Sequence, residues 1–326
     1  MKKTVEFEDY LFLGCNTLPE DMQVDFLDYF KYLLDTNFSD LEESLRLGLE
    51  IKSFPKRNDQ QIIEGVLAVT LKDLDKKRKD KNYYYCNAVC LIKVIRSIYN
   101  NNLYNFLNNE KVSRIALHNY ENILKWIFID AQELCNLYSN ILKNDYRYKS
   151  SIDKRYIHYM SVHQVLRQSL FGQVSLNSFA DMEISAAIAV IRQLIELRVR
   201  RAFGTLSYID QEGNLLPLEL SLVFECLKKH KEDIIFPISL ENIERIYKWS
   251  NLYIHSGKND LSCIPYFIEN MLKTLSFGEI KYNGWDVKNA ISTSEDIIEQ
   301  IHQELIVLGK KPNLSIYTCR PECILK

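Results

Sequence analysis

The amino-acid sequence predicts a mainly α-helical protein in two parts, and three observations support this fold class. The chain has 326 residues with 47% hydrophobic content, enough to bury the cores of two domains of about 100 to 200 residues each. It contains only 10 Gly and 7 Pro, whereas an all-β fold with many tight turns needs more of both. Apolar side chains recur at helical spacing in the long stretches between them. We therefore expect an all-α fold with minor irregular or β segments.

Residues 1–172 are expected to form an N-terminal helical domain after a short extended opening. Helical periodicity in this part predicts helices over 19–34, 39–51, 59–74, 83–107, 113–142 and 152–170. The segment 72–82 is a mixed-charge run with six basic residues. Its interspersed Asp residues favour a solvated helix end or loop over a contact with a polyanion. No motif indicates the role of this domain.

A second domain is expected to begin near residue 173, because 171–178 combines a glycine with a polar cluster ahead of an N-cap candidate, Asp181. Periodicity predicts four helices in this domain, over 182–203, 217–229, 239–255 and 261–275. A turn or hairpin is expected at 210–213, where Asp and Gly occur together. We place this four-helix bundle at 173–278 and a C-terminal extension at 279–326, with a helix over 294–308 and an irregular tail from Gly309.

Charge and hydropathy exclude several classes of protein. The formal net charge is −2 and the pI is near 6.3, so a polybasic nucleic-acid protein is excluded and any RNA binding must be local. The first nine residues carry acids where a secretory signal has its apolar segment, and the longest apolar runs, such as 186–191, are too short to span a bilayer. We expect a cytoplasmic protein that does not contact a membrane.

Eight cysteines are scattered along the chain, and without a secretory signal they are expected to be reduced thiols. Two pairs, Cys86 with Cys90 and Cys319 with Cys323, have i,i+4 spacing. Four thiolates can bind zinc, but these pairs lack the tight Cys-x-x-Cys knuckle and an adjacent His, so we expect buried structural cysteines. The sequence predicts no metal and no cofactor.

The helices expected at 182–203 and 239–255 each carry a thin polar seam on an apolar body. On the first helix, above Ser185, the seam residues are spaced i, i+4 and i+8: Arg192, Glu196 and Arg200. On the second helix, which ends at a glycine stop, the seam consists of Glu244, Lys248, Asn251 and His255.

If the two seams face one another, guanidinium, ammonium, imidazole and amide groups line one groove. Arginine suits bidentate phosphate contacts, and a histidine donates or accepts a proton near neutral pH, which are the ingredients for binding RNA and for cleaving it by 2′-OH attack. The alternative is structural. The arginines and Glu196 then form an ordinary intrahelical ion-pair ladder, residues 198–201 complement the helix dipole, and His255 caps a C-terminus.

Two segments in this order resemble the HEPN superfamily of α-helical bundles: Ile191-Arg-Gln-Leu-Ile-Glu-Leu-Arg-Val-Arg-Arg-Ala-Phe-Gly204, then Trp249-Ser-Asn-Leu-Tyr-Ile-His-Ser-Gly257 with one helix after it. The resemblance covers residues 181–277 and identifies 173–278 as a HEPN-like bundle. It implies a homodimer and a role in a prokaryotic defence, toxin or CRISPR-linked system. Many members are metal-independent ribonucleases, and others have lost catalysis and act as binding modules.

The catalytic signature of that family is Arg, four to six residues, then His, and this chain departs from it. Nine residues separate Arg245 from His255, and Ser250 stands where the short form of the signature has Arg. Asn251 matches the polar position that follows, and Lys248 stands where the longest form has Arg, without its planar fork.

The resemblance therefore leaves open whether the protein is an enzyme. As a metal-independent endoribonuclease it uses His255 as general acid/base and Asn251 to orient it, and binds substrate with Arg192, Arg200 and Lys248, the arginines being oriented by Glu196. The alternatives are a non-catalytic interaction or dimerisation module of a defence complex, and a nucleotide-binding module. The expected partners are RNA, a second copy of the chain and an operon-encoded protein.

Overall fold

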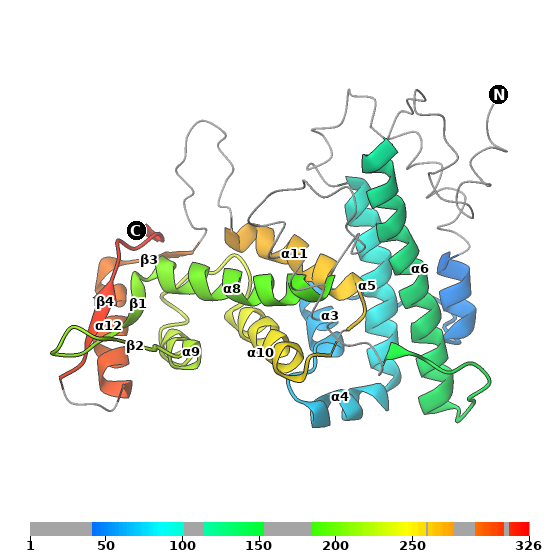
Figure 1. Ribbon diagram of the computed structural model, residues 1–326, viewed down its shortest axis with the longest axis horizontal. Coiled ribbons are helices and arrows are strands. Elements are labelled where there is room, and N and C mark those ends of the chain that lie inside the picture. Colours follow the sequence, from blue (N-terminus) through cyan, green and yellow to red (C-terminus); the bar gives the residue numbers. More distant parts are fainter. Residues whose placement is uncertain are drawn as a thin grey trace. The chain divides into compact units, whose positions relative to one another are not determined.

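The structure is a computed structural model that describes residues 41–100, 114–152, 184–258, 260–276, 291–309 and 313–325, without the side chains of 98–100, 114–125, 184–186 and 276. Helices account for most of the described residues, which confirms the all-α class with minor β segments (Figure 1). The helices that we predicted at 19–34 and 152–170 lie outside the described residues, as do the predicted domain boundaries at 172/173 and 278/279.

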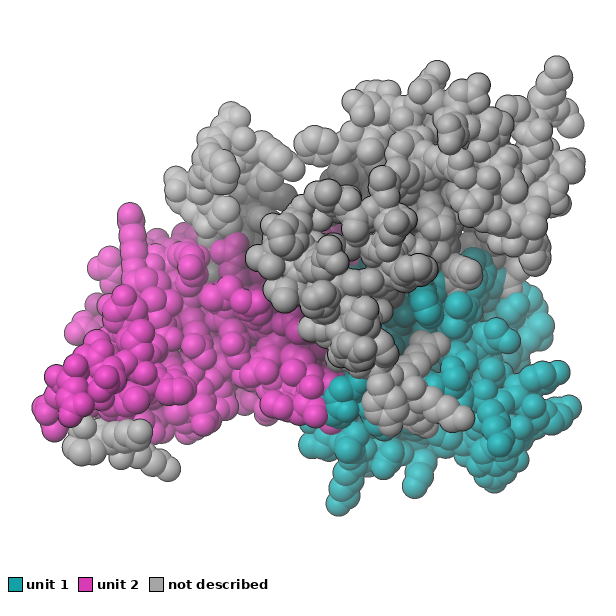
Figure 2. Space-filling view, in the orientation of Figure 1, with its two compact units in different colours: residues 1–187, 256–267 teal, residues 188–255, 268–326 magenta. Residues whose placement is uncertain are grey.

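The chain divides into two compact units (Figure 2). Unit 1 consists of Met1–Ala187 and Ser256–Phe267, and unit 2 of Ile188–His255 and Ile268–Lys326. Unit 1 contains a helix at 41–48. It is followed by α3 (Asp59–Val66), α4 (Leu71–Arg78), α5 (Lys81–Asn100) and α6 (Arg114–Leu142).

The single helix that we predicted over 59–74 is two helices, α3 and α4, and local capping explains the break. Asn58 caps α3 in a reciprocal pair with Gln61, whose backbone N–H donates to Asn58 Oδ1 at 2.8 Å. The backbone of Leu67 is extended and ends α3. Thr70 then starts α4, because its hydroxyl accepts the N–H of Asp73 at 3.1 Å. Apolar periodicity alone does not reveal that one helix ends and another begins here, since the apolar spacing continues across a short break.

The core of unit 1 lies around α5, which packs against α3 and α6. Tyrosines with almost no exposed surface dominate it. Tyr84 on α5 meets Tyr83 and, from α6, Tyr138 edge-on, with ring centroids 5.3 and 5.2 Å apart. Such edge-to-face pairs add to the gain from apolar burial. Asp130 on α6, fully buried, accepts the backbone N–H of Cys263 at 3.0 Å.

Unit 2 follows the predicted order of helices. Its helices are α8 (Ile184–Ala202, which begins in unit 1), α9 (Leu220–Lys229), α10 (Leu240–Ser256), the later part of α11 (Cys263–Ser276) and α12 (Glu295–Leu308). Its strands are β1 (Thr205–Ile209), β2 (Leu215–Leu216), β3 (Ser292–Thr293), β4 (Ser315–Thr318) and β5 (Ile324–Leu325). The helices predicted at 217–229, 239–255 and 294–308 are confirmed within three residues at each end.

The strands form a three-stranded sheet of order β2-β1-β4 and a parallel pair of β3 with β5. The predicted hairpin is confirmed, since β1 and β2 pair antiparallel across a turn in which Asp210 Oδ1 accepts the N–H groups of Glu212 and Asn214. We had predicted an irregular tail from Gly309, but the tail contains two strands, β4 and β5. Strand β4 pairs antiparallel with β1, about a hundred residues earlier, so its partner is not visible in local sequence.

The C-terminal segment also closes the end of α8. The N–H groups of Glu322 and Cys323 donate to the carbonyls of Arg201 and Ala202, at 2.9 and 3.2 Å. These are carbonyls that the last turn of a helix leaves without an intrahelical donor. The end of α8 is therefore a fixed structural anchor of unit 2.

Candidate functional site

The first element of the candidate site is a contact between α8 and α10 within unit 2. Arg192 Nε lies 3.5 Å from Glu196 Oε1, one turn away on α8. From α10, the hydroxyl of Tyr247 donates to the same Glu196 oxygen at 3.1 Å, and the Arg192 guanidinium lies over the Tyr247 ring, 5.7 Å from its centroid. The polar seam residues of α8 therefore contact α10, and the residue of α10 that they contact is Tyr247.

Tyr247 is the member of this site that sequence reasoning missed. In the sequence an aromatic ring at this position reads as one of the apolar residues around the seam of α10, and in the structure the side chain is half-buried. Its hydroxyl reaches a carboxylate 51 positions away, and no local pattern identifies such a partner.

The second element is a carboxylate held between two lysines. Glu244 Oε2 lies 2.7 Å from Lys228 Nζ of α9, and Glu244 Oε1 lies 2.9 Å from Lys248 Nζ. Burial of Glu244 favours its protonated form, but the hydrogen bonds from both lysines outweigh burial and lower its pKa below the usual value of 4.5. Lys248 remains half exposed and, within α10, is the cation nearest in sequence to Asn251 and His255.

Arg200 is committed to the backbone of unit 2. Its Nη1 donates to the carbonyl of Leu206 at 3.1 Å and its Nη2 to the carbonyl of Leu218 at 2.6 Å. These bonds tie α8 to β1 and to the segment before α9. Arg200 was predicted to bind substrate together with Arg192. In the structure Arg192 pairs with Glu196, whereas Arg200 binds backbone carbonyls.

His255 and Asn251 lie one turn apart at the end of α10. The imidazole of His255 is exposed and has no hydrogen-bond or ion-pair partner among the described residues. Asn251 is partly buried, and no described residue donates a hydrogen bond to its enclosed Oδ1 atom. The helix stops beyond Ser256, where Gly257 has φ +64°. An imidazole is thus presented to solvent by a helix whose other side buries Trp249 and Tyr253.

Metal ligation receives no support from the described part of the chain, where no group of three His, Cys, Asp or Glu side chains is arranged to hold an ion. Cys86 and Cys90 are buried on α5, whereas Cys319 and Cys323 lie between β4 and β5 and not on a helix. The helical spacing that we read into the second pair is therefore wrong, because these two cysteines lie in the segment that connects two strands.

Unit 1 contains a polar pocket of about 310 Å³. The residues that line it are Arg57, Gln61, Glu64, Gly65, Lys77, Asp80, Asn82 and Tyr83. Its polar groups bind one another: Arg57 Nη2 donates to Asn82 Oδ1 at 3.1 Å, and Lys77 Nζ donates to the carbonyl of Glu64. Two cations and two carboxylates balance in charge, so the lining selects no class of ligand.

Comparison of the chain with protein-family models, with curated proteins and with solved structures finds no match. Within the described ranges, no helix has the length and apolar content needed to cross a membrane.

Proposed function

We propose that this chain is a HEPN-like protein that acts on RNA, in a prokaryotic defence or toxin system, as a metal-independent endoribonuclease with His255 as general acid/base. The observation that supports this most directly is the exposed imidazole one turn beyond Asn251, which has no partner among the described residues, on a helix that buries seven of its side chains. A structural cap histidine would instead bond a carbonyl of its own helix end.

The chemistry needs one proton acceptor, one proton donor and a cation. Neutral His255 takes the proton of a ribose 2′-OH, the 2′-oxygen attacks the adjacent phosphorus, and the 5′-oxygen of the next nucleotide leaves with a proton returned by the imidazolium. The products are a 2′,3′-cyclic phosphate and a free 5′-hydroxyl. Lys248 and Arg192 are the cations proposed to stabilise the charge that develops on the phosphorane oxygens, and Asn251 is proposed to orient the phosphate or the imidazole.

Replacement of His255 by Gln tests the proposal, because Gln keeps polarity and approximate size but cannot transfer a proton. With full-length protein and a labelled single-stranded RNA, His255→Gln should lower the cleavage rate by about 100-fold to 10,000-fold, the usual contribution of general acid/base catalysis. His230→Gln is the matched control, since His230 lies in the same unit and pairs with Glu304 at 2.9 Å. Equal rates for His255→Gln and wild type, or no cleavage by wild-type protein, would refute the nuclease.

A second candidate function, a non-catalytic interaction module, is favoured by a specific observation: Arg192, Arg200 and Lys248 all have partners within the chain. In this proposal unit 2 docks a second copy of the chain or an operon-encoded protein. Arg192→Glu should then break the complex in size-exclusion chromatography with light scattering, while His255→Gln should leave it intact. An unchanged complex with Arg192→Glu would count against this module.

A further inference from the structure

The loop that follows α6 in unit 1 presents four consecutive exposed side chains that alternate between aromatic and cationic: Tyr146, Arg147, Tyr148 and Lys149. Tyr146 is 57% exposed and Tyr148 is 74% exposed, whereas Tyr84 and Tyr138 of the same unit are almost fully buried. Two large rings exposed next to each other give up burial energy that the core tyrosines gain. Their exposure therefore requires an explanation beyond folding.

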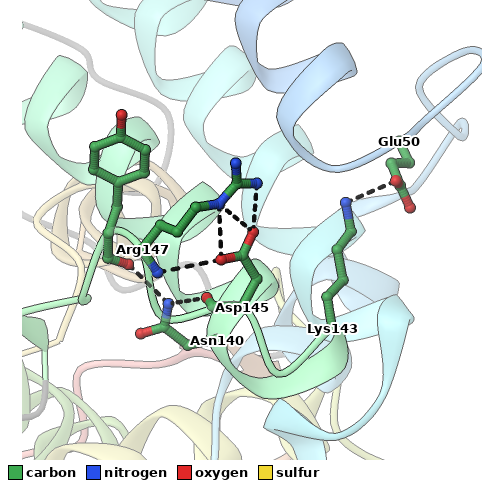
Figure 3. A network of polar contacts seen from close by, with 6 residues as sticks. Glu50, Asn140, Lys143, Asp145 and Arg147 are labelled. Carbon is green, nitrogen blue, oxygen red and sulfur yellow. Dashed lines mark hydrogen bonds and ion pairs between the residues drawn. The ribbon is translucent and has the colours of Figure 1, made fainter.

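The backbone of this loop is held in one conformation by a buried side chain of α6. Asn140, only 8% exposed, donates through Nδ2 to the carbonyls of Asp145 at 2.9 Å and Tyr148 at 2.8 Å (Figure 3). Its Oδ1 accepts the N–H of Ser150 at 3.2 Å. Asn144 adopts φ +53° at the start of the turn. The loop is thus ordered from beneath, and both rings are presented by a fixed backbone.

A second side chain of α6 fixes the other end of the loop. Glu133 accepts the hydroxyl of Ser150 at 2.7 Å, and the N–H and hydroxyl of Ser151 at 2.6 and 2.8 Å. A surface loop with all of these groups satisfied has lost most of its conformational freedom before any partner binds. A ligand that docks on it pays little of the ordering cost that weakens binding to flexible loops.

Two cations of the loop, Arg147 and Lys149, lie beside the exposed rings and retain donors for a phosphate. Residues 143–149 carry three cations, Lys143, Arg147 and Lys149, and one carboxylate, Asp145. Asp145 holds Arg147 through Nε and Nη2, the latter at 2.7 Å, and the guanidinium lowers the pKa of Asp145. Arg147 Nη1 makes no hydrogen bond to a described residue, and Lys149 has no ion-pair partner among them. Lys143 is paired with Glu50 at 2.7 Å (Figure 3).

We propose that this loop, Tyr146–Lys149, is a docking site for single-stranded RNA, in which unstacked bases stack on Tyr146 and Tyr148 while Arg147 and Lys149 contact the phosphates. Exposed aromatic rings with interleaved cations are the combination that binds single strands, because every base has a face that stacks and every phosphate carries a charge. A duplex offers no free base faces and is not a ligand for this site. The inference rests on the proposed function, since it supplies the substrate contact of an RNA-acting protein.

Fluorescence anisotropy with the full-length protein tests the site. The probe is a labelled single-stranded RNA that carries a 2′-O-methyl group at every ribose, so that it cannot be cleaved. The variant Tyr146→Ala/Tyr148→Ala should weaken binding by about 5-fold to 150-fold for each ring removed. The variant Tyr146→Phe/Tyr148→Phe keeps both rings and should bind within about threefold of wild type. Tyr317→Ala is the matched control, because Tyr317 is an exposed tyrosine of unit 2.

Two further arms separate stacking from charge and order. Arg147→Gln/Lys149→Gln should reduce the slope of log affinity against log salt by about 1.4, the value for two phosphate contacts to a single strand. Asn140→Ala removes no group of the contact surface, and should weaken binding by releasing the loop. Circular dichroism of each variant checks that the fold is retained.

The outcomes distinguish this inference from the proposed function. If the double Ala variant binds within twofold of wild type and unmodified RNA is still cleaved, the loop is refuted and the nuclease stands. If binding depends on the two rings but unmodified RNA is not cleaved, the loop stands and the nuclease is refuted. Tighter binding of duplex RNA than of the single-stranded probe, or no binding of the probe, would each overturn the assignment of single-stranded RNA.

Discussion

Replacement of Arg200 by Met tests whether Arg200 stabilises the fold or binds substrate. Methionine keeps an apolar stem and removes the guanidinium that donates to the carbonyls of Leu206 and Leu218 at 3.1 and 2.6 Å. A hydrogen bond to a charged donor contributes about 1.5 to 3 kcal/mol, and a carbonyl left without a donor costs a similar amount. Water can replace part of this at a partly exposed site, so we expect the free energy of unfolding of unit 2 to fall by about 2 to 4 kcal/mol.

Urea unfolding of the full-length protein measures this loss. The fluorescence of Trp249, which is fully buried in α10, reports on unit 2 once Trp126 and Trp285 are replaced by Phe. Arg201→Met is the matched control: it removes the next arginine of α8, which is half exposed and pairs with Glu322 at 3.3 Å, and should cost less than about 1 kcal/mol. If both variants change stability equally, Arg200 is not an anchor.

Gly204→Ala should destabilise unit 2 by about 2 to 4 kcal/mol, because a Cβ there lies 2.5 Å from the carbonyl oxygen of Cys319 at φ +68°. Gly213→Ala, in the same unit at φ +84° with open space around the added Cβ, should cost about 1 kcal/mol in the same urea titration. The pKa of Glu244 is lowered in the folded protein, so the stabilising effect of its charged form is present above pH 4.5 and is lost as the pH falls through the folded pKa. The stability difference between wild type and Glu244→Gln should therefore shrink as the pH falls below 4.5, and a difference that stays constant as the pH falls would contradict the pairing. Burial raises the pKa of Cys135 and Cys226 to about 11, so iodoacetamide should label these thiols far more slowly at pH 8 in native protein than in urea, as measured by mass spectrometry, and equal rates would exclude burial.

Much of the fold can be predicted from the sequence because helix formation is encoded locally. Apolar spacing and caps place α6, α9, α10 and α12 close to their observed ends. The strands could not be predicted in the same way, since β4 finds its partner in β1 and β5 in β3, at separations that no local window covers. The start of α4 after the break depends on the hydroxyl of Thr70, which accepts the N–H of Asp73, and apolar periodicity carries no information about such a cap.

The candidate site was predicted less completely than the fold, for a related reason. Helical spacing shows which residues share a face, and it placed Arg192 with Glu196 and Glu244 with Lys248, which are ion-paired in the structure. It cannot show what stands opposite that face. The partner of Glu196 is Tyr247, and the partners of Arg200 are backbone carbonyls, because tertiary contacts decide how a polar seam is satisfied.

The energies of these partners decide which cations of the candidate site can reach a phosphate. Lys248 is held by an i,i+4 pair that contributes about 0.2 to 0.5 kcal/mol, and when it leaves, Glu244 keeps Lys228 at 2.7 Å. Arg192 can leave Glu196 at a similar cost, since that carboxylate retains the Tyr247 hydroxyl. Arg200 can reach a ligand only by abandoning two backbone carbonyls, at several times that cost. A phosphate that docks beside His255 should therefore draw on Lys248 and Arg192, while Arg200 holds the helix that carries Arg192 in place.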